Sequence, residues 1–208
     1  KERKKWNENT WNTIDFGMFG RHCRRLSASH RVFNMKLVHN QLPLGFRRHQ
    51  RSTSKDDSLK KCPCCGTADE DETHLFRCSA NSFQTTGITQ LRRDTASGPH
   101  PLRKLLTEGI TNWVNTGSSN FQVCITDYPP HMREAVRTIT AEQAAIGWEN
   151  AIKGFLSKSW MDIASMEYGH MKKSITEGAC RMRRCTDALF KFSCGIWKSR
   201  NSALHESE

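Results

Sequence analysis

The seventeen residues from Cys62 to Cys78 constrain this chain more than any other stretch. The segment begins Cys-Pro-Cys-Cys-Gly and ends His-Leu-Phe-Arg-Cys, which gives the spacing C-x2-C-x8-H-x3-C. Three thiolates and one imidazole form a complete tetrahedral ligand set for zinc. We therefore expect Cys62, Cys65, His74 and Cys78 to bind one structural zinc ion.

Local backbone chemistry supports both halves of this motif. Pro63 stands in the first turn where no N–H donor is needed, and Gly66 can adopt the positive φ that ends the turn. His74 and Cys78 are four residues apart, so they share one face of a helix. The acidic residues placed to cap that helix and favour its N-terminus are Asp69, Asp71 and Glu72.

Two alternatives to this ligand set follow from the same residues. Cys64 can replace Cys65 as a ligand, although C-x2-C followed by glycine suits the turn better. A disulfide is disfavoured because nothing at the N-terminus resembles a secretory signal, which also makes an intracellular location, cytoplasmic or nuclear, the expectation.

The order of motifs around the cysteines is more specific than the cysteines alone. Arg31-Val-Phe-Asn-Met-Lys-Leu-Val-His-Asn-Gln-Leu-Pro43 and Arg47-Arg48 precede them, and the series resembles the zinc-binding region after the polymerase of non-LTR retrotransposon reverse transcriptases. In that family a helix ending in H-x-x-L-P leads through a basic segment into C-P-x-C-G and H-L-F-x-x-C ligands. The His74-to-Cys78 gap is one residue shorter here.

This resemblance covers residues from about 30 to 80. It implies that the chain is the C-terminal part of a retroelement reverse transcriptase-like protein. By the same resemblance, its role would be to help hold template RNA or target DNA near the polymerase. The first residues, Lys-Glu-Arg-Lys-Lys without Met, also suggest part of a longer product.

The positive charge lies almost entirely before the cysteine motif. Residues 1–61 contain 15 Lys and Arg against 5 Asp and Glu, a net charge of +10 out of +11 for the whole chain. A basic segment beside a rigid zinc module favours contact with a polyanion. We expect it to bind RNA or DNA through phosphates, with little base specificity. The candidate nucleic-acid-binding residues are Arg24, Arg25, Arg31, Lys36, Arg47, Arg48 and Arg51.

The remaining pattern predicts a mainly α fold, with the small zinc-bound module between a basic N-terminal helix and a C-terminal helical bundle. One helix is expected from Arg21 to Gln41, stopped by Pro43, and another turn or two follows from Leu44 to Arg51. The expected divisions are a basic helical arm at 1–54, the zinc module at 55–81, a linker at 82–100 with one possible short helix, and a helical bundle at 101–208. The last helix of the bundle is marked by apolar residues at helical spacing: Met182, Cys185, Leu189, Phe192 and Ile196.

The sequence offers no catalytic motif that we recognise. It contains neither a phosphate-binding G-x-x-x-x-G-K-[ST] loop nor a G-x-S-x-G elbow. The adjacent pair Asp56-Asp57 lacks the aromatic-x-Asp-Asp setting of a polymerase, and Glu149 and Lys153 have the spacing of a helical ion pair. We expect a non-catalytic protein, without a membrane partner because no apolar run is long enough. Four histidines are expected to be surface or capping residues: His22, His30, His39 and His49.

Two other functional classes remain open at this stage. The zinc module can brace a helical surface for a protein partner, or the chain can be a decayed reading frame. The choice between RNA and DNA and the oligomeric state are also left open by the sequence.

Overall fold

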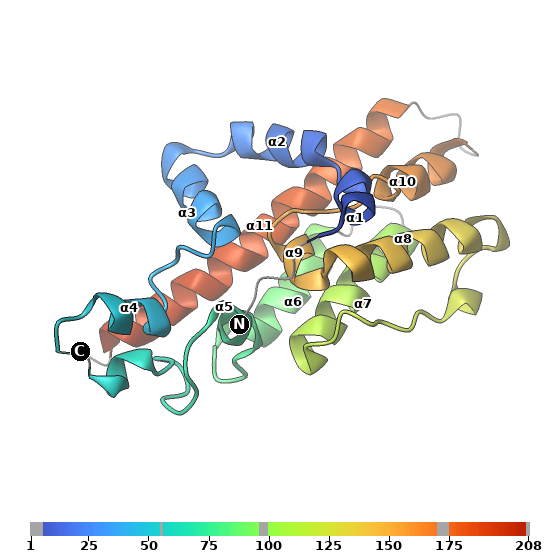
Figure 1. Cartoon of the computed structure of the whole chain (residues 1–208). Helices are drawn as coiled ribbons and strands as arrows, with labels where there is room; N and C mark the ends of the chain where they lie inside the picture. The colour runs from blue at the N-terminus through green and yellow to red at the C-terminus, as the bar shows by residue number, and fades with distance from the viewer. Residues whose placement is uncertain (1–5, 55, 96–99, 170–174, 207–208) are drawn as a thin grey trace.

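The computed structural model describes residues 6–54, 56–95, 100–169 and 175–206 (Figure 1). The described residues are mainly helical and contain no β-strand apart from two isolated bridges, which confirms the predicted fold class. The helices are α1 (Glu8–Thr13), α2 (Phe16–Arg25), α3 (Ala28–Val38), α4 (Gly45–Arg51), α5 (Glu72–Arg77), α6 (Phe83–Asp94), α7 (His100–Thr116), α8 (Arg133–Ile146), α9 (Trp148–Ile152), α10 (Trp160–Gly169) and α11 (Ile175–Glu206), with short 3-10 helices at Asp57–Lys60, Ile125–Asp127 and Pro130–Met132.

The long helix α11 crosses the whole molecule, and the helices that pack against it include α2, α3, α5, α6, α9 and α10 (Figure 1). Its predicted apolar stripe from Met182 to Ile196 is buried, as the helical spacing of these residues requires. In the described part of the chain, no helix combines the length and apolar character that crossing a bilayer requires.

The single helix predicted from Arg21 to Gln41 is wrong, because α2 ends at Arg25 and α3 begins at Ala28. Leu26 adopts an extended backbone, and the Ser27 hydroxyl accepts a hydrogen bond from the His30 N–H at 3.4 Å. Ser27 is thus an N-cap that satisfies a free donor of a new helix. The two helices consequently run in different directions (Figure 1).

His22, for which we expected a surface or capping role, is buried. Its Nδ1 lies 3.0 Å from the Asp187 carboxylate of α11, and the Arg25 guanidinium donates to the same carboxylate at 3.0 Å. Burial raises the pKa of Asp187, but these hydrogen bonds outweigh it and lower that pKa below its usual value. His22 therefore joins α2 to α11 through a partner 165 residues away, which no local pattern reveals.

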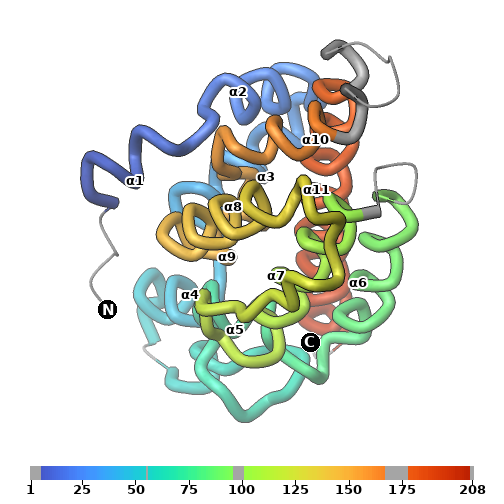
Figure 2. The backbone as a smooth tube through the Cα atoms, turned by 90° about the vertical axis from the view of Figure 1, so that its right-hand side faces the viewer, coloured from blue at the N-terminus to red at the C-terminus, as the bar shows by residue number. Residues whose placement is uncertain are grey.

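The segment expected to be a linker contains the twelve-residue helix α6, which lies along α11 (Figure 2). The Asn81 side chain donates to the Ile196 carbonyl of α11 at 3.1 Å, and the Phe83 ring lies directly over Gly195. One buried apolar core includes Leu37, Leu75 and Leu189. The expected domain divisions stay a prediction, but this core extends across all of them.

Trp148 occupies the centre of the C-terminal half and is fully buried. Its indole makes edge-to-face contacts with Phe121 at 6.0 Å and Trp160 at 6.3 Å. The indole also lies on the backbone of α7 at Gly109, where a Cβ atom would come within 2.1 Å of the ring. Glycine is required at this position because only a residue without a Cβ allows so close an approach.

We predict that Gly109→Ala lowers the free energy of unfolding by about 1–3 kcal/mol through overpacking against Trp148. Helix propensity alone would change it by about 1 kcal/mol in the opposite direction. Gly178→Ala in α11 is the matched control, because the nearest neighbour of its Cβ would be Ala164, at an ordinary contact distance of 3.5 Å. Urea unfolding of both variants provides the measurement, and equal stabilisation by the two alanines would contradict the packing argument.

Candidate metal centre

Cys62, Cys65, His74 and Cys78 come together as the sequence predicts, and one ligand atom from each lies within 4.8 Å of all the others. The sulfurs of Cys62 and Cys78 are 3.7 Å apart, and the Cys65 sulfur is 3.5 Å from His74 Nε2. In a tetrahedral site with metal–sulfur bonds of about 2.3 Å, two sulfurs would be roughly 3.8 Å apart. The four side chains therefore fit a four-coordinate metal ion.

The first half of the site is a closed turn. The Gly66 N–H donates to the Cys62 carbonyl at 2.8 Å, and the Cys62 N–H donates to the Ala68 carbonyl at 2.9 Å. Gly66 has φ of +68°, the left-handed conformation that the sequence predicts for it. This turn directs Cys65 toward the second half of the site.

Hydrogen bonds prepare the Cys65 sulfur to act as a thiolate. Burial raises the pKa of this thiol, but donors from the Ala68 backbone, from Thr67 and from His74 outweigh burial and lower the pKa to about 6. At Cys78 the pKa is raised instead, to about 12. Burial is the main cause, and the neighbouring Cys62 adds to the increase. Because metals bind the thiolate, metal uptake must release the Cys78 proton.

The structure places Cys65, and not Cys64, in the cluster of four. Burial, with an added contribution from nearby Cys62, raises the pKa of the Cys64 thiol to about 11. Because Cys78, an accepted member of the cluster, has a still higher pKa, it is the position of Cys64 outside the cluster that supports the preferred ligand assignment.

The helix α5 divides its residues between the metal site and the core. Asp71 accepts a hydrogen bond from the His74 N–H at 2.7 Å, so it is the N-cap among the three predicted candidates. Leu75 and Phe76 are buried on the core side. Arg77 donates to the carbonyls of Val114 and Asn115, the last turn of α7, at 3.1 and 3.4 Å. The metal ligands are thereby attached to the C-terminal helices.

The other two predicted caps have different partners. Asp69 pairs with Lys61 at 2.8 Å, and Glu72 pairs with Lys153 at 2.5 Å. Lys153 also donates to the Asn40 side chain at 3.1 Å. The helical pairing of Lys153 with Glu149 that its spacing suggests is wrong, since α9 ends at Ile152 and directs Lys153 toward α5.

A buried ion pair that the sequence does not reveal connects the metal loop to α11. Glu70 is completely buried and Arg200 is 1% exposed. Arg200 donates to the two Glu70 oxygens at 2.7 and 2.6 Å, in a bidentate arrangement. The Gly45 N–H at the start of α4 donates to the same carboxylate at 2.7 Å. The sequence does not predict the burial of Glu70, because this residue lies within the acidic run 69–72, which is typical of a solvated loop.

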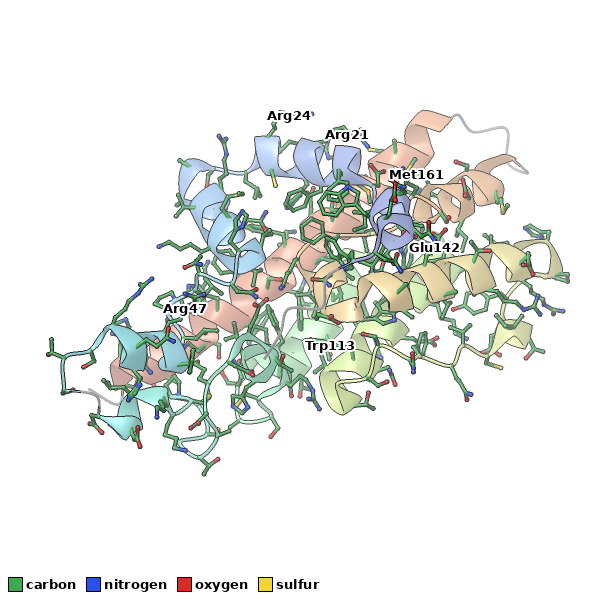
Figure 3. The ribbon with its side chains drawn as sticks, viewed as in Figure 1. Arg21, Arg24, Arg47, Trp113, Glu142 and Met161 are labelled. Atoms are coloured by element: carbon green, nitrogen blue, oxygen red, sulfur yellow. The ribbon has the colours of Figure 1, made fainter. Side chains whose placement is uncertain are left out.

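The predicted nucleic-acid-binding residues lie on α2, α3 and α4, and differ in accessibility. Arg47 and Arg48 are half-buried. Arg25 is exposed, but its guanidinium is held by Asp187 and by the Arg21 carbonyl. Arg21, which we did not include, extends outward from α2 beside Arg24, and Arg47 extends from α4 (Figure 3). The other exposed cations of the predicted set are Arg24, Arg31, Lys36 and Arg51.

We predict that Cys62→Ser and His74→Ala abolish stoichiometric metal binding, while Cys64→Ser retains one metal ion per chain. The first two variants remove a ligand of the four-coordinate set, and the third removes a thiol outside it. Metal content of the purified variants, measured by mass spectrometry, provides the check. Full metal content in Cys62→Ser would refute the ligand set, and loss in Cys64→Ser would exchange Cys64 for Cys65.

We also predict that Arg200→Met lowers the free energy of unfolding by about 3–5 kcal/mol, because it leaves a buried carboxylate without its partner. Lys198→Met is the matched control on the same helix, at an exposed position. Adding Glu70→Gln to Arg200→Met should recover part of the loss, since a neutral amide costs less to bury than a carboxylate. Urea unfolding of the metal-loaded proteins measures all three, and equal losses in Arg200→Met and Lys198→Met would contradict the role of the pair.

In comparisons with known proteins, no protein-family model, curated protein or solved structure matches the chain. What it does must therefore be inferred from the metal centre, the charge and the exposed side chains.

Proposed function

We propose that this chain is a non-catalytic, zinc-stabilised nucleic-acid-binding module. The observation that carries the proposal is the position of the basic residues on α2, α3 and α4, of which α4 is attached directly to the metal loop. Gly45 and Phe46, the first residues of α4, donate their N–H groups to Glu70, at 2.7 and 3.3 Å. The metal centre thus orders a helix that ends in arginines.

Zinc is the metal that this donor set suits best. Three sulfurs and one imidazole nitrogen in tetrahedral arrangement favour zinc over the hard cations, which prefer oxygen ligands. With all four positions taken by protein side chains, the ion would have no open position for a substrate. We therefore assign it a structural role, in which it supplies folding free energy to the loop from Cys62 to Cys78.

The charges on α4 favour a polyanionic ligand. The helix contains Arg47, Arg48 and Arg51 and no acidic residue. Together with the exposed cations of α2 and α3, these arginines supply contacts to phosphates, which provide affinity and position without reading sequence. Ordering α4 through the metal loop lowers the entropy lost when several arginines engage one nucleic-acid backbone.

The resemblance to the region after the polymerase of non-LTR retrotransposon reverse transcriptases supports the same proposal. A basic helical segment before a zinc module is what that resemblance implies, and we propose that the chain derives from the C-terminal part of such a protein. Its role there would be to hold template RNA or target DNA near a polymerase carried elsewhere in the protein.

A protein-interaction module is the second candidate, and one specific observation favours it. Val32 and Met35 on α3 are 54% and 42% exposed, although both are apolar. They lie on the same side of the helix, three residues apart. Apolar side chains exposed together on a helix are common at protein interfaces.

We predict that replacing Arg47, Arg48 and Arg51 together by Gln weakens binding to unrelated nucleic-acid sequences by similar factors. Each lost phosphate contact should reduce the slope of log affinity against log salt by about 1, so the slope should flatten by up to about 3. Fluorescence anisotropy with single-stranded RNA and duplex DNA at several salt concentrations measures both quantities.

The control for this experiment replaces Arg181, Arg183 and Arg184 of α11 by Gln. This change removes the same charge from a region where Arg183 already lies 3.9 Å from Asp187, so its effect should be smaller. If the wild-type protein binds neither nucleic acid at low salt, or binds equally well after the α4 substitutions, the protein-interaction function takes the place of this one.

A further inference from the structure

Phe46 is the exposed aromatic residue that neither the metal centre nor the core explains. It lies in the first turn of α4 between buried Gly45 and half-buried Arg47, yet it is 53% exposed. A single exposed apolar side chain is ordinary on a protein surface. Phe46 differs because its backbone is held rigidly and its helix neighbours are cationic.

Three contacts hold the backbone at Gly45 and Phe46 in place. The Phe46 N–H donates to the Glu70 carbonyl at 3.3 Å, and the Gly45 N–H donates to the Glu70 carboxylate at 2.7 Å. Gly45 also touches the chain at Lys60 so closely that a Cβ would lie 2.3 Å from the Lys60 carbonyl oxygen. The first turn of α4 therefore cannot rotate without breaking its contacts with the metal loop. The ring projects from a rigid base and loses little entropy when a ligand covers it.

The residues that follow Phe46 are suited to a nucleic-acid backbone. Arg47, Arg48 and Arg51 share its helix, and α4 contains no carboxylate that would repel phosphates. An exposed ring beside several cations is the combination that single-strand-binding proteins use, because the ring stacks on a base while the cations contact phosphates. In a duplex the bases are already stacked on one another and offer no free face.

We propose that Phe46 stacks on an unpaired base, so that the α4 surface binds single-stranded nucleic acid in preference to duplex. The inference rests on the proposed nucleic-acid-binding function and specifies its substrate class. Stacking requires only the π-face that every base has, so the preference concerns strandedness and not sequence.

The test compares Phe46→Leu, which keeps an apolar side chain but removes the ring, with Phe46→Tyr, which keeps the ring. Phe46→Leu should weaken binding to a single-stranded oligonucleotide by roughly 5- to 150-fold, the range that stacking on one base implies. Binding to duplex of the same sequence should change by less than about twofold. Phe46→Tyr should bind the single strand like wild type.

Trp11→Leu is the matched control, because Trp11 is also a 53% exposed ring but lies on α1, away from α4 (Figure 1). It should leave single-strand affinity unchanged. Metal content and the urea midpoint of every variant verify that the fold is intact. The wild-type protein adds an independent readout, since photocrosslinking to a single strand containing iodouracil should label the peptide that includes Phe46.

The outcomes separate this inference from the function on which it rests. If wild type binds nucleic acid with the predicted salt dependence but Phe46→Leu binds the single strand equally well, the stacking inference is overturned and the proposed function stands. Equal losses for single strand and duplex, or crosslinks confined to other peptides, also overturn it. If wild type binds neither strand form at low salt, both proposals are refuted together.

Discussion

The Glu70 carboxylate has no access to water, and this condition determines how three parts of the chain meet. A buried charge is tolerated only when it is paired and hydrogen-bonded. Glu70 meets the requirement with two donors from Arg200 and one from the Gly45 backbone. These donors come from α11 and α4, while Glu70 itself lies between the two halves of the metal site. The metal loop, the basic helix and the terminal helix can therefore reach their native positions only together.

The candidate metal centre consequently packs directly against the main core. His74 and Cys78 face the site, while Leu75 and Phe76 between them enter the main core and Arg77 closes the last turn of α7. Neighbouring residues of this short segment thus contact the metal site, the main core and the last turn of α7. An ion that orders this helix would stabilise the packing of α5 on α7 and α11 as well as the loop between its own ligands.

The proposed function depends on α4, the helix that Glu70 holds in place. Gly45, which meets Glu70, is buried, whereas Phe46 and Arg51 are exposed and Arg47 is half-buried. A bound metal ion would then act together with the buried ion pair, because the free energy of folding the metal loop would hold α4 in a preorganised position. The exposed apolar residues of α3 offer a different kind of surface, which suits a protein partner.

The sequence by itself determined the cluster of four candidate metal ligands, because each half of the cluster is encoded in a few neighbouring residues: the Gly66 turn and the four-residue helical spacing of His74 and Cys78. It also determined α11, whose apolar residues from Met182 to Ile196 recur at helical spacing. We did not predict the break at Ser27, although the run from Ser27 to Arg31 interrupts the apolar pattern between Leu26 and Val32. Only the tertiary structure decided which polar residues are buried. The paired residues are His22 with Asp187, Lys153 with Glu72, and Glu70 with Arg200, and the members of each pair are 81 to 165 positions apart in the sequence. A charged residue in a polar stretch has the same local pattern whether it meets water or a distant partner, so its burial depends on the packing of the whole chain.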